Sequence, residues 1–174
     1  VAPYDPMHLF FCNVVPKLWS LATGTFEVER DVSDAFVLGR TVRTAMGKEF
    51  KAAAATVPAR QARTLRNIDT RCGSFRVADW LFFLLCGGEV LLYGRVPDNF
   101  YEMFMCLCRA GRVLFRPSAV SPSELSAAEA EIKAFLVAFY DIVYGGRKER
   151  LKVCLFVFAA LLDVVPNVKQ CGPA

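Results

Sequence analysis

One short motif brings together groups that could share a proton or bind a cation. It is Asp5-Pro6-Met7-His8, and His8 is the only histidine among the 174 residues. An aspartate three residues before a histidine can accept a hydrogen bond from one ring nitrogen and fix the tautomer of the ring. The pair could also ligate a cation. In the plainer interpretation Asp5 caps the first helix and His8 lies in its first turn, and the spacing alone favours this one.

Positive charge is concentrated in the second quarter of the chain. The net charge is +4, but the segment from Arg40 to Arg76 has nine basic and two acidic residues, a net +7. This density suits a phosphate backbone, which releases counterions when it is neutralised. A solvated surface without a specific partner is the alternative. The candidate DNA-binding residues are Arg40, Arg43, Lys48, Lys51, Arg60, Arg63, Arg66, Arg71 and Arg76. If helical, the piece with Arg60, Arg63 and Arg66 would align them on one side.

Seven cysteines supply the remaining reactive groups. No Cys-x-x-Cys pair occurs, and Cys106 and Cys108 would point to different faces of a helix, so the spacing does not favour a metal site. Most of the cysteines lie in apolar stretches, where this residue behaves as a small hydrophobe. We therefore expect buried, reduced thiols in a reducing compartment, cytosol or nucleus, and no metal bound by this chain.

Composition indicates a globular domain that is rich in helix. Apolar residues make up 55% of the chain and charged residues 22%, which excludes disorder, collagen and coiled coil. The longest uncharged apolar run, residues 153–162, is too short to span a bilayer, so no membrane partner is expected. The abrupt start at Val1 and the end after Ala174 suggest an internal fragment of a longer protein.

Apolar spacing and capping signals predict five or six helices, and no strand. In the first half, a helix over 7–20 has Pro16 as a kink or break, and a second over 31–47 begins at Asp31 or Ser33 and ends near Gly47. Residues 48–76 are predicted to be a loop with one short helix. The expected fold class is mostly α, a helical bundle.

The second half contains the clearest local signals. A helix over 78–92 should break or bend at Gly87-Gly88, and another should follow over 99–115. Ser121-Pro122-Ser123-Glu124 predicts a capping box that opens a helix to Tyr144, closed by Gly145-Gly146. A last helix is predicted over 149–165, limited by Pro166. The buried positions should include Phe100, Phe104, Leu107, Val113, Ile132, Leu136, Phe139 and Val143.

Five segments follow one another in an order that is typical of one family. The opening PYDPMHLFFCNVVPKLWSLATGTF has a D-x-M-H motif, an apolar helix and T-G-x-F. The later ones are TVPARQARTLRNID, VADWLFFLL, LLYGRVPDNFYEMFMCLCRA and RLKVCLFVFAALLDVVPNVKQCGPA. Together they resemble blocks of CACTA-like cut-and-paste DNA transposases, including the Plavaka-type elements, across nearly the whole chain.

This resemblance implies an internal piece of a nuclear DDE/D transposase. In such enzymes an RNase H-like core holds two divalent metal ions, Mg²⁺, on three carboxylates for phosphodiester cleavage and strand transfer. The D-x-x-H motif there precedes a large helical insertion. Residues 1–25 would then be the edge of the core and residues 26–174 the insertion. The metal carboxylates would lie outside this chain, which would bind transposon-end DNA, the rest of the transposase and, in an oligomer, its own copies.

The chain also departs from the family pattern. Ala159 and Asp163 replace two histidines of the last block, and a glycine is missing before Arg66-Asn67-Ile68. A decayed or domesticated copy is therefore plausible. The alternative function is a non-catalytic helical module that binds a protein partner.

Overall fold

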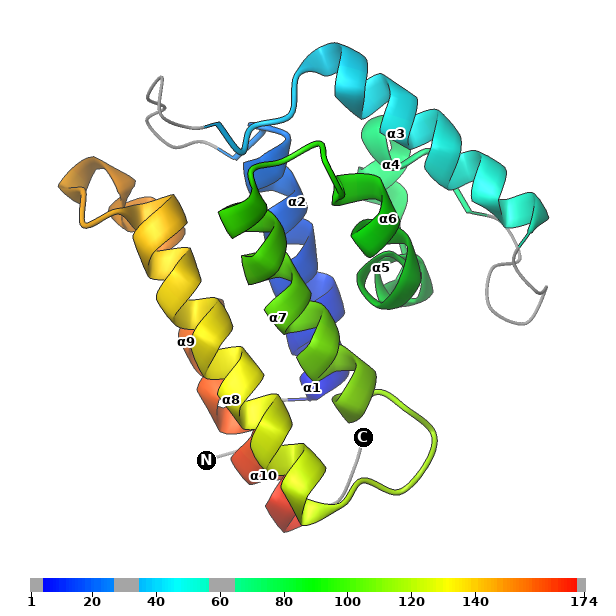
Figure 1. Cartoon of the computed structure of the whole chain (residues 1–174). Coiled ribbons are helices and arrows are strands. Elements are labelled where there is room, and N and C mark those ends of the chain that lie inside the picture. The colour runs from blue at the N-terminus through cyan, green and yellow to red at the C-terminus, as the bar shows by residue number, and fades with distance from the viewer. Residues whose placement is uncertain (1–4, 27–34, 57–64, 172–174) are drawn as a thin grey trace.

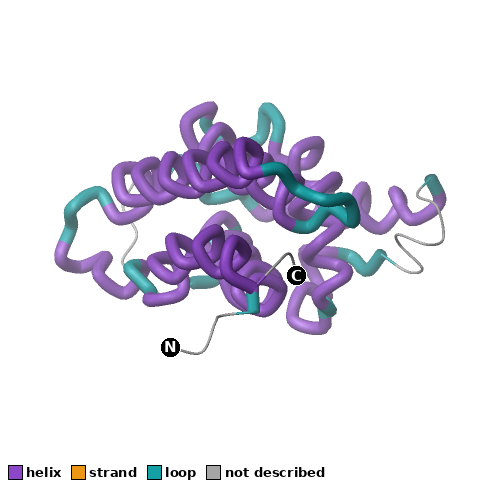
Figure 2. Tube along the Cα trace, turned by 90° about the horizontal axis from the view of Figure 1, so that it is seen from below, coloured by secondary structure: helices purple, strands orange, loops and turns teal. Residues whose placement is uncertain are grey.

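The computed structural model describes residues 5–26, 35–56 and 65–171, and Figure 1 shows the arrangement of its helices. No strand occurs in these ranges (Figure 2), which confirms the mostly α fold class. Short π-helical and 3-10 turns join many of the α-helices. The α-helices are α1 (Pro6–His8), α2 (Val15–Ala22), α3 (Arg40–Ala52), α4 (Ile68–Arg71), α5 (Val77–Phe82), α6 (Gly88–Leu92), α7 (Asp98–Leu114), α8 (Pro122–Phe139), α9 (Phe156–Ala159) and α10 (Val164–Cys171).

The first helical segment runs without interruption from α1 through the π turn Leu9–Val14 into α2. The predicted break at Pro16 is therefore wrong. In the π turn the backbone hydrogen bonds reach back five residues instead of four, so that the Val15 N–H donates to the Phe10 carbonyl. Pro16 follows Val15 directly and has no N–H to donate. The segment buries Phe10, Phe11 and Val14 almost completely and forms the centre of the core.

The other helices surround this central segment (Figure 1). α7 packs along α8, while α5 and α9 contact the π turn Leu9–Val14. α10 packs against α8, and α3 lies at the opposite end of the molecule from α1. Aromatic side chains fill much of the interior, with Phe83, Phe100 and Phe135 at most 2% exposed. None of the described helices is long and apolar enough to cross a membrane.

The helix predicted over 31–47 differs from the observed one at both ends. Residues 35–39 are not helical, so α3 begins only at Arg40, and it continues through Gly47 to Ala52, so Gly47 does not end it. Asp31 and Ser33 lie outside the described residues. In the region predicted to be a loop with one short helix, the described part contains α4 and two 3-10 turns, Ala53–Ala55 and Cys72–Ser74.

The capping box at Ser121 is confirmed. The Glu124 carboxylate accepts the Ser121 backbone N–H at 2.8 Å, and Pro122 occupies the first turn of α8. A π turn, Tyr140–Tyr144, prolongs α8 as far as Gly145, whose φ of 60° ends the helix. Of the predicted buried positions, Val113 and Leu136 are only half-buried.

Two further helix predictions hold only in part. The helix over 78–92 is continuous through α5, a π turn (Phe83–Gly87) and α6, so a break at Gly87-Gly88 is wrong, and the π turn is the irregularity that lies there. The last helix is divided into a 3-10 turn (Lys148–Val153), α9, another 3-10 turn (Ala160–Asp163) and α10. The backbone is extended at Leu155, with ψ at 143°. Pro166 does not limit the helix because it lies in the first turn of α10, where a missing N–H costs little.

Candidate nucleic-acid interface

The candidate interface is built on α3 and on the segment that contains α4. These two elements pack against each other, and α3 also contacts α6. The close approach occurs at Gly47, because a Cβ atom there would lie only 2.8 Å from Asn67 Cγ. Asn67 in turn caps α4, since its Oδ1 accepts the backbone N–H groups of Asp69 at 2.9 Å and Thr70 at 3.1 Å. The glycine in α3 therefore fixes where α4 lies.

The structure separates the predicted basic residues into different roles. Arg43 is half-buried and structural, because its Nη1 donates to the Thr23 carbonyl at 3.0 Å and its Nε lies 3.8 Å from Asp69 Oδ1. Arg76 lies 3.8 Å from the buried carboxylate of Asp79. These two guanidinium groups are thus already engaged within the protein.

Four of the predicted cations remain exposed and form no ion pair with another described residue: Arg40, Lys48, Lys51 and Arg71. Neither acidic residue of the segment pairs with these four cations. The Glu49 carboxylate accepts hydrogen bonds from both terminal nitrogens of Arg95, at 2.8 and 2.9 Å, and Asp69 lies beside Arg43. The positive charge of this surface is therefore not neutralised by its own carboxylates.

Arg60 and Arg63 lie outside the described residues, so their predicted alignment is not tested there. Arg66, the third member of that series, precedes α4 and is not helical. Its Nη1 donates to the Ser74 carbonyl at 2.6 Å. That bond holds the half-buried guanidinium against the 3-10 turn Cys72–Ser74.

A hollow of about 640 Å³ lies between α3 and the α4 segment. Its lining is basic and polar with one aliphatic side chain, and it contains Lys51, Leu65, Arg66, Asn67, Thr70, Arg71 and Ser74. No acidic residue is among these described lining residues. The hollow can therefore accept an anion.

The charge pattern identified Lys51, Arg66 and Arg71 but missed the polar lining residues. Asn67, Thr70 and Ser74 recur with Arg71 at offsets of three, four and seven residues, the spacing of one helix face. That pattern was a signal for them in the sequence. The hollow itself could not be predicted, because it exists only where α4 packs on α3.

The Asp5–His8 pair combines both roles considered for it. Asp5 Oδ1 accepts the Met7 backbone N–H at 2.9 Å and caps α1, while Oδ2 lies 2.5 Å from His8 Nδ1. The hydrogen bond to His8 lowers the pKa of Asp5. The two side chains are exposed, and α1 lies at the far end of the molecule from α3 (Figure 1). The structure therefore does not place this pair in the basic surface.

The described cysteines are free thiols with different environments. The expectation that they are buried is wrong for Cys12, Cys86 and Cys154, which are exposed. Cys106 and Cys108 do differ in their surroundings: Cys108 is buried, and Cys106 accepts a hydrogen bond from Arg109 at 3.2 Å. Burial raises the pKa of Cys108 to about 12.

Within residues 5–26, 35–56 and 65–171 no three His, Cys, Asp or Glu side chains come together in a group that could hold a metal ion. Asp5 and His8 supply only two such groups.

Comparisons with protein-family models, with curated proteins and with solved structures find no match to this chain.

Proposed function

We propose that this chain is an internal piece of a CACTA-like DDE/D transposase that acts in the nucleus, with the D-x-x-H motif and most of the helical insertion. We propose also that it binds the phosphate backbone of transposon-end DNA through the surface of α3 and α4. The metal-dependent cleavage would belong to carboxylates of the complete enzyme. The observation that carries the DNA-binding role is the unneutralised charge on this surface. Arg40, Lys48, Lys51 and Arg71 are exposed, while Glu49 and Asp69 are turned to other cations.

The order of the sequence segments supports the assignment to this family. The five segments that resemble the transposases occur in the family's order across the chain. Within the described residues, α3 lies at the opposite end of the molecule from α1 (Figure 1). The basic surface would then face away from the D-x-x-H motif at the edge of the core.

The test is fluorescence anisotropy with a labelled DNA duplex over a salt series. Backbone binding predicts that log Kd varies linearly with log salt, with a slope of about 0.9 for each phosphate neutralised. Arg40→Ala and Lys48→Ala should each weaken binding and lower that slope by about one unit. Binding that does not respond to salt would contradict the proposal.

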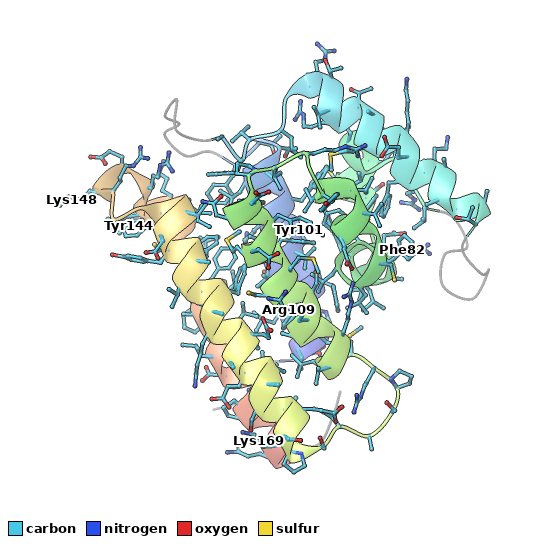
Figure 3. The ribbon with its side chains drawn as sticks, in the orientation of Figure 1. Phe82, Tyr101, Arg109, Tyr144, Lys148 and Lys169 are labelled. Carbon is cyan, nitrogen blue, oxygen red and sulfur yellow. The ribbon has the colours of Figure 1, made fainter. Side chains whose placement is uncertain are left out.

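Lys148→Ala provides a charge-matched control for these variants. Lys148 is an exposed cation outside the basic segment, and Figure 3 places it on the opposite flank of the molecule from α3. Its removal changes the net charge by the same amount as Arg40→Ala. If both variants lose the same affinity, the binding reflects overall charge, and the surface of α3 and α4 has no special role.

One observation favours the alternative function, a helical module for protein association. Val90 in the middle of α6 and Tyr93 directly after the helix are 75% and 74% exposed, which is unusual for large apolar side chains. Self-association through this patch predicts a mass above 19.3 kDa in light scattering and a return to the monomer for Tyr93→Ser. A monomer at all concentrations would remove the support for this alternative.

A further inference from the structure

The hollow beside α4 has more positive charge than an internal DNA phosphate requires. Lys51, Arg66 and Arg71 all line it, and none of its described lining residues is acidic. An internal phosphodiester carries one negative charge. A terminal phosphate monoester carries about −1.5 to −2 at neutral pH and presents three strong acceptor oxygens. Three cations around one hollow match the terminal group better.

The lining is partly organised before any ligand binds. The Ser74 carbonyl holds the Arg66 guanidinium at 2.6 Å, and the Ser74 hydroxyl donates to the Arg71 carbonyl at 2.9 Å, which fixes the turn between them. Lys51 and Arg71 make no ion pair with a described residue and keep their donors available. Thr70 adds an exposed hydroxyl.

The size of the hollow is sufficient for a strand end. It is open to solvent, and its volume of about 640 Å³ has room for a terminal phosphate together with its sugar. We infer that this hollow binds the terminal phosphate of a DNA strand through Lys51, Arg66 and Arg71, an inference that rests on the proposed DNA-binding function.

The experiment measures the affinity of the full chain for two DNA duplexes. The duplexes are identical, and each is labelled at the 3′ end, but only one of them carries a 5′-phosphate. Two additional ion pairs at exposed cations predict about tenfold tighter binding of the phosphorylated duplex. Arg71→Ala should weaken binding of both duplexes and also remove this preference, so that the phosphorylated and unphosphorylated duplexes bind the variant with equal affinity. Lys51→Ala is a second variant at an exposed position and should reduce the preference as well. Arg40→Ala, outside the hollow, should weaken both duplexes equally and keep the preference.

The possible outcomes distinguish this inference from the proposed function. Equal, salt-dependent affinities for the two duplexes would overturn the terminal-phosphate site and leave backbone binding intact. A preference that persists in both Arg71→Ala and Lys51→Ala would also overturn it, because the hollow would not be its source. No binding of either duplex would overturn both proposals.

Discussion

Gly47 of α3 and Asn67 at the start of α4 occupy positions that leave no room for a side chain on the glycine. A Cβ atom at residue 47 would lie 2.8 Å from Asn67 Cγ and 2.9 Å from Nδ2. The same Asn67 side chain caps α4 through two backbone N–H groups. The contact therefore couples helix packing, helix capping and the position of the basic hollow.

Gly47→Ala should destabilise the protein although alanine favours helix more than glycine does. The gain in helix propensity is about 1 kcal/mol, whereas overpacking of a close contact costs about 1–3 kcal/mol and here also displaces a cap. We expect a net loss of about 1–2 kcal/mol, measured by chemical denaturation followed by circular dichroism. Phosphate-backbone affinity should fall too, because α4 moves.

Gly73→Ala is the matched control for this substitution. No atom lies within 4 Å of a Cβ at Gly73, so the change in stability should stay within about 0.5 kcal/mol. Shortening the cap with Asn67→Ser should relieve the Gly47→Ala variant in a double-mutant cycle. Equal stabilities for Gly47→Ala and the wild type would show that the Asn67 side chain can move aside at no cost.

Arg40 and Arg43 lie three residues apart on α3 but should respond differently to alanine. The Arg43 guanidinium donates to the Thr23 carbonyl and lies beside Asp69, and its side chain is only 23% exposed. Arg43→Ala should therefore lower the free energy of unfolding by about 1–3 kcal/mol. Arg40 is exposed and makes no ion pair with a described residue, so Arg40→Ala should leave the melting temperature unchanged and weaken DNA binding. Denaturation and anisotropy measured on both variants check this division. A stable Arg43→Ala variant would be inconsistent with it.

Local chemistry determined which elements could be predicted. The box at Ser121 and Glu124 involves neighbouring residues and side-chain hydrogen bonds, so the sequence alone specified the start of α8. Gly47 and Gly88 were predicted to end or bend helices, whereas their role is tertiary. A Cβ at Gly88 would lie 2.8 Å from the Phe83 carbonyl oxygen and 2.6 Å from Cζ of the Phe104 ring of α7. Only the packed structure contains that information.

The basic surface was predictable in the same partial way. Charge counting located the segment from Arg40 to Arg76, but it treated all its cations as equivalent. The carbonyl of Thr23, which bonds Arg43, is 20 residues away along the chain, and Arg95, which engages Glu49, is 46 residues away. Such long-range pairing decides which charges remain available, and it cannot be deduced from spacing.

The carboxylate of Glu124 should make the stability of α8 depend on acid. Arg116, which donates from two nitrogens at 2.7 Å, and then the Ser121 cap lower the pKa of Glu124 from 4.5 to about 2. Because the folded pKa is depressed, the contribution is fully present above about pH 4.5 and is lost as the pH falls through about 2. Glu124→Gln should therefore be less stable than wild type at pH 7, and the difference should shrink between pH 4.5 and 2.

Denaturant titrations of both proteins across this pH range measure the effect. Glu102→Gln is a suitable control, because the Glu102 carboxylate is exposed and lies 3.7 Å from Arg109 without a capping role. Its stability difference at pH 7 should be smaller. A Glu124→Gln difference that stays constant from pH 7 to pH 2 would mean that the folded state does not favour the ionised carboxylate.

Thiol labelling should separate the cysteines by their surroundings. Cys12, Cys86 and Cys154 are exposed and should react with N-ethylmaleimide in the native protein, whereas Cys108 is buried with its pKa raised to about 12. At pH 8 only about 10⁻⁴ of such a thiol is ionised, and the thiolate is the nucleophile. Cys106 should react at an intermediate rate, because burial raises its pKa while the thiol stays half-buried beside Arg109. Cys106 and Cys108 lie in the same peptide, so the labelled residue is identified from fragment ions in mass spectrometry. Labelling of the protein unfolded in guanidinium provides the reference in which every thiol is accessible. If native Cys108 reacted as fast as Cys86, the tight packing of α7 in the core would be contradicted.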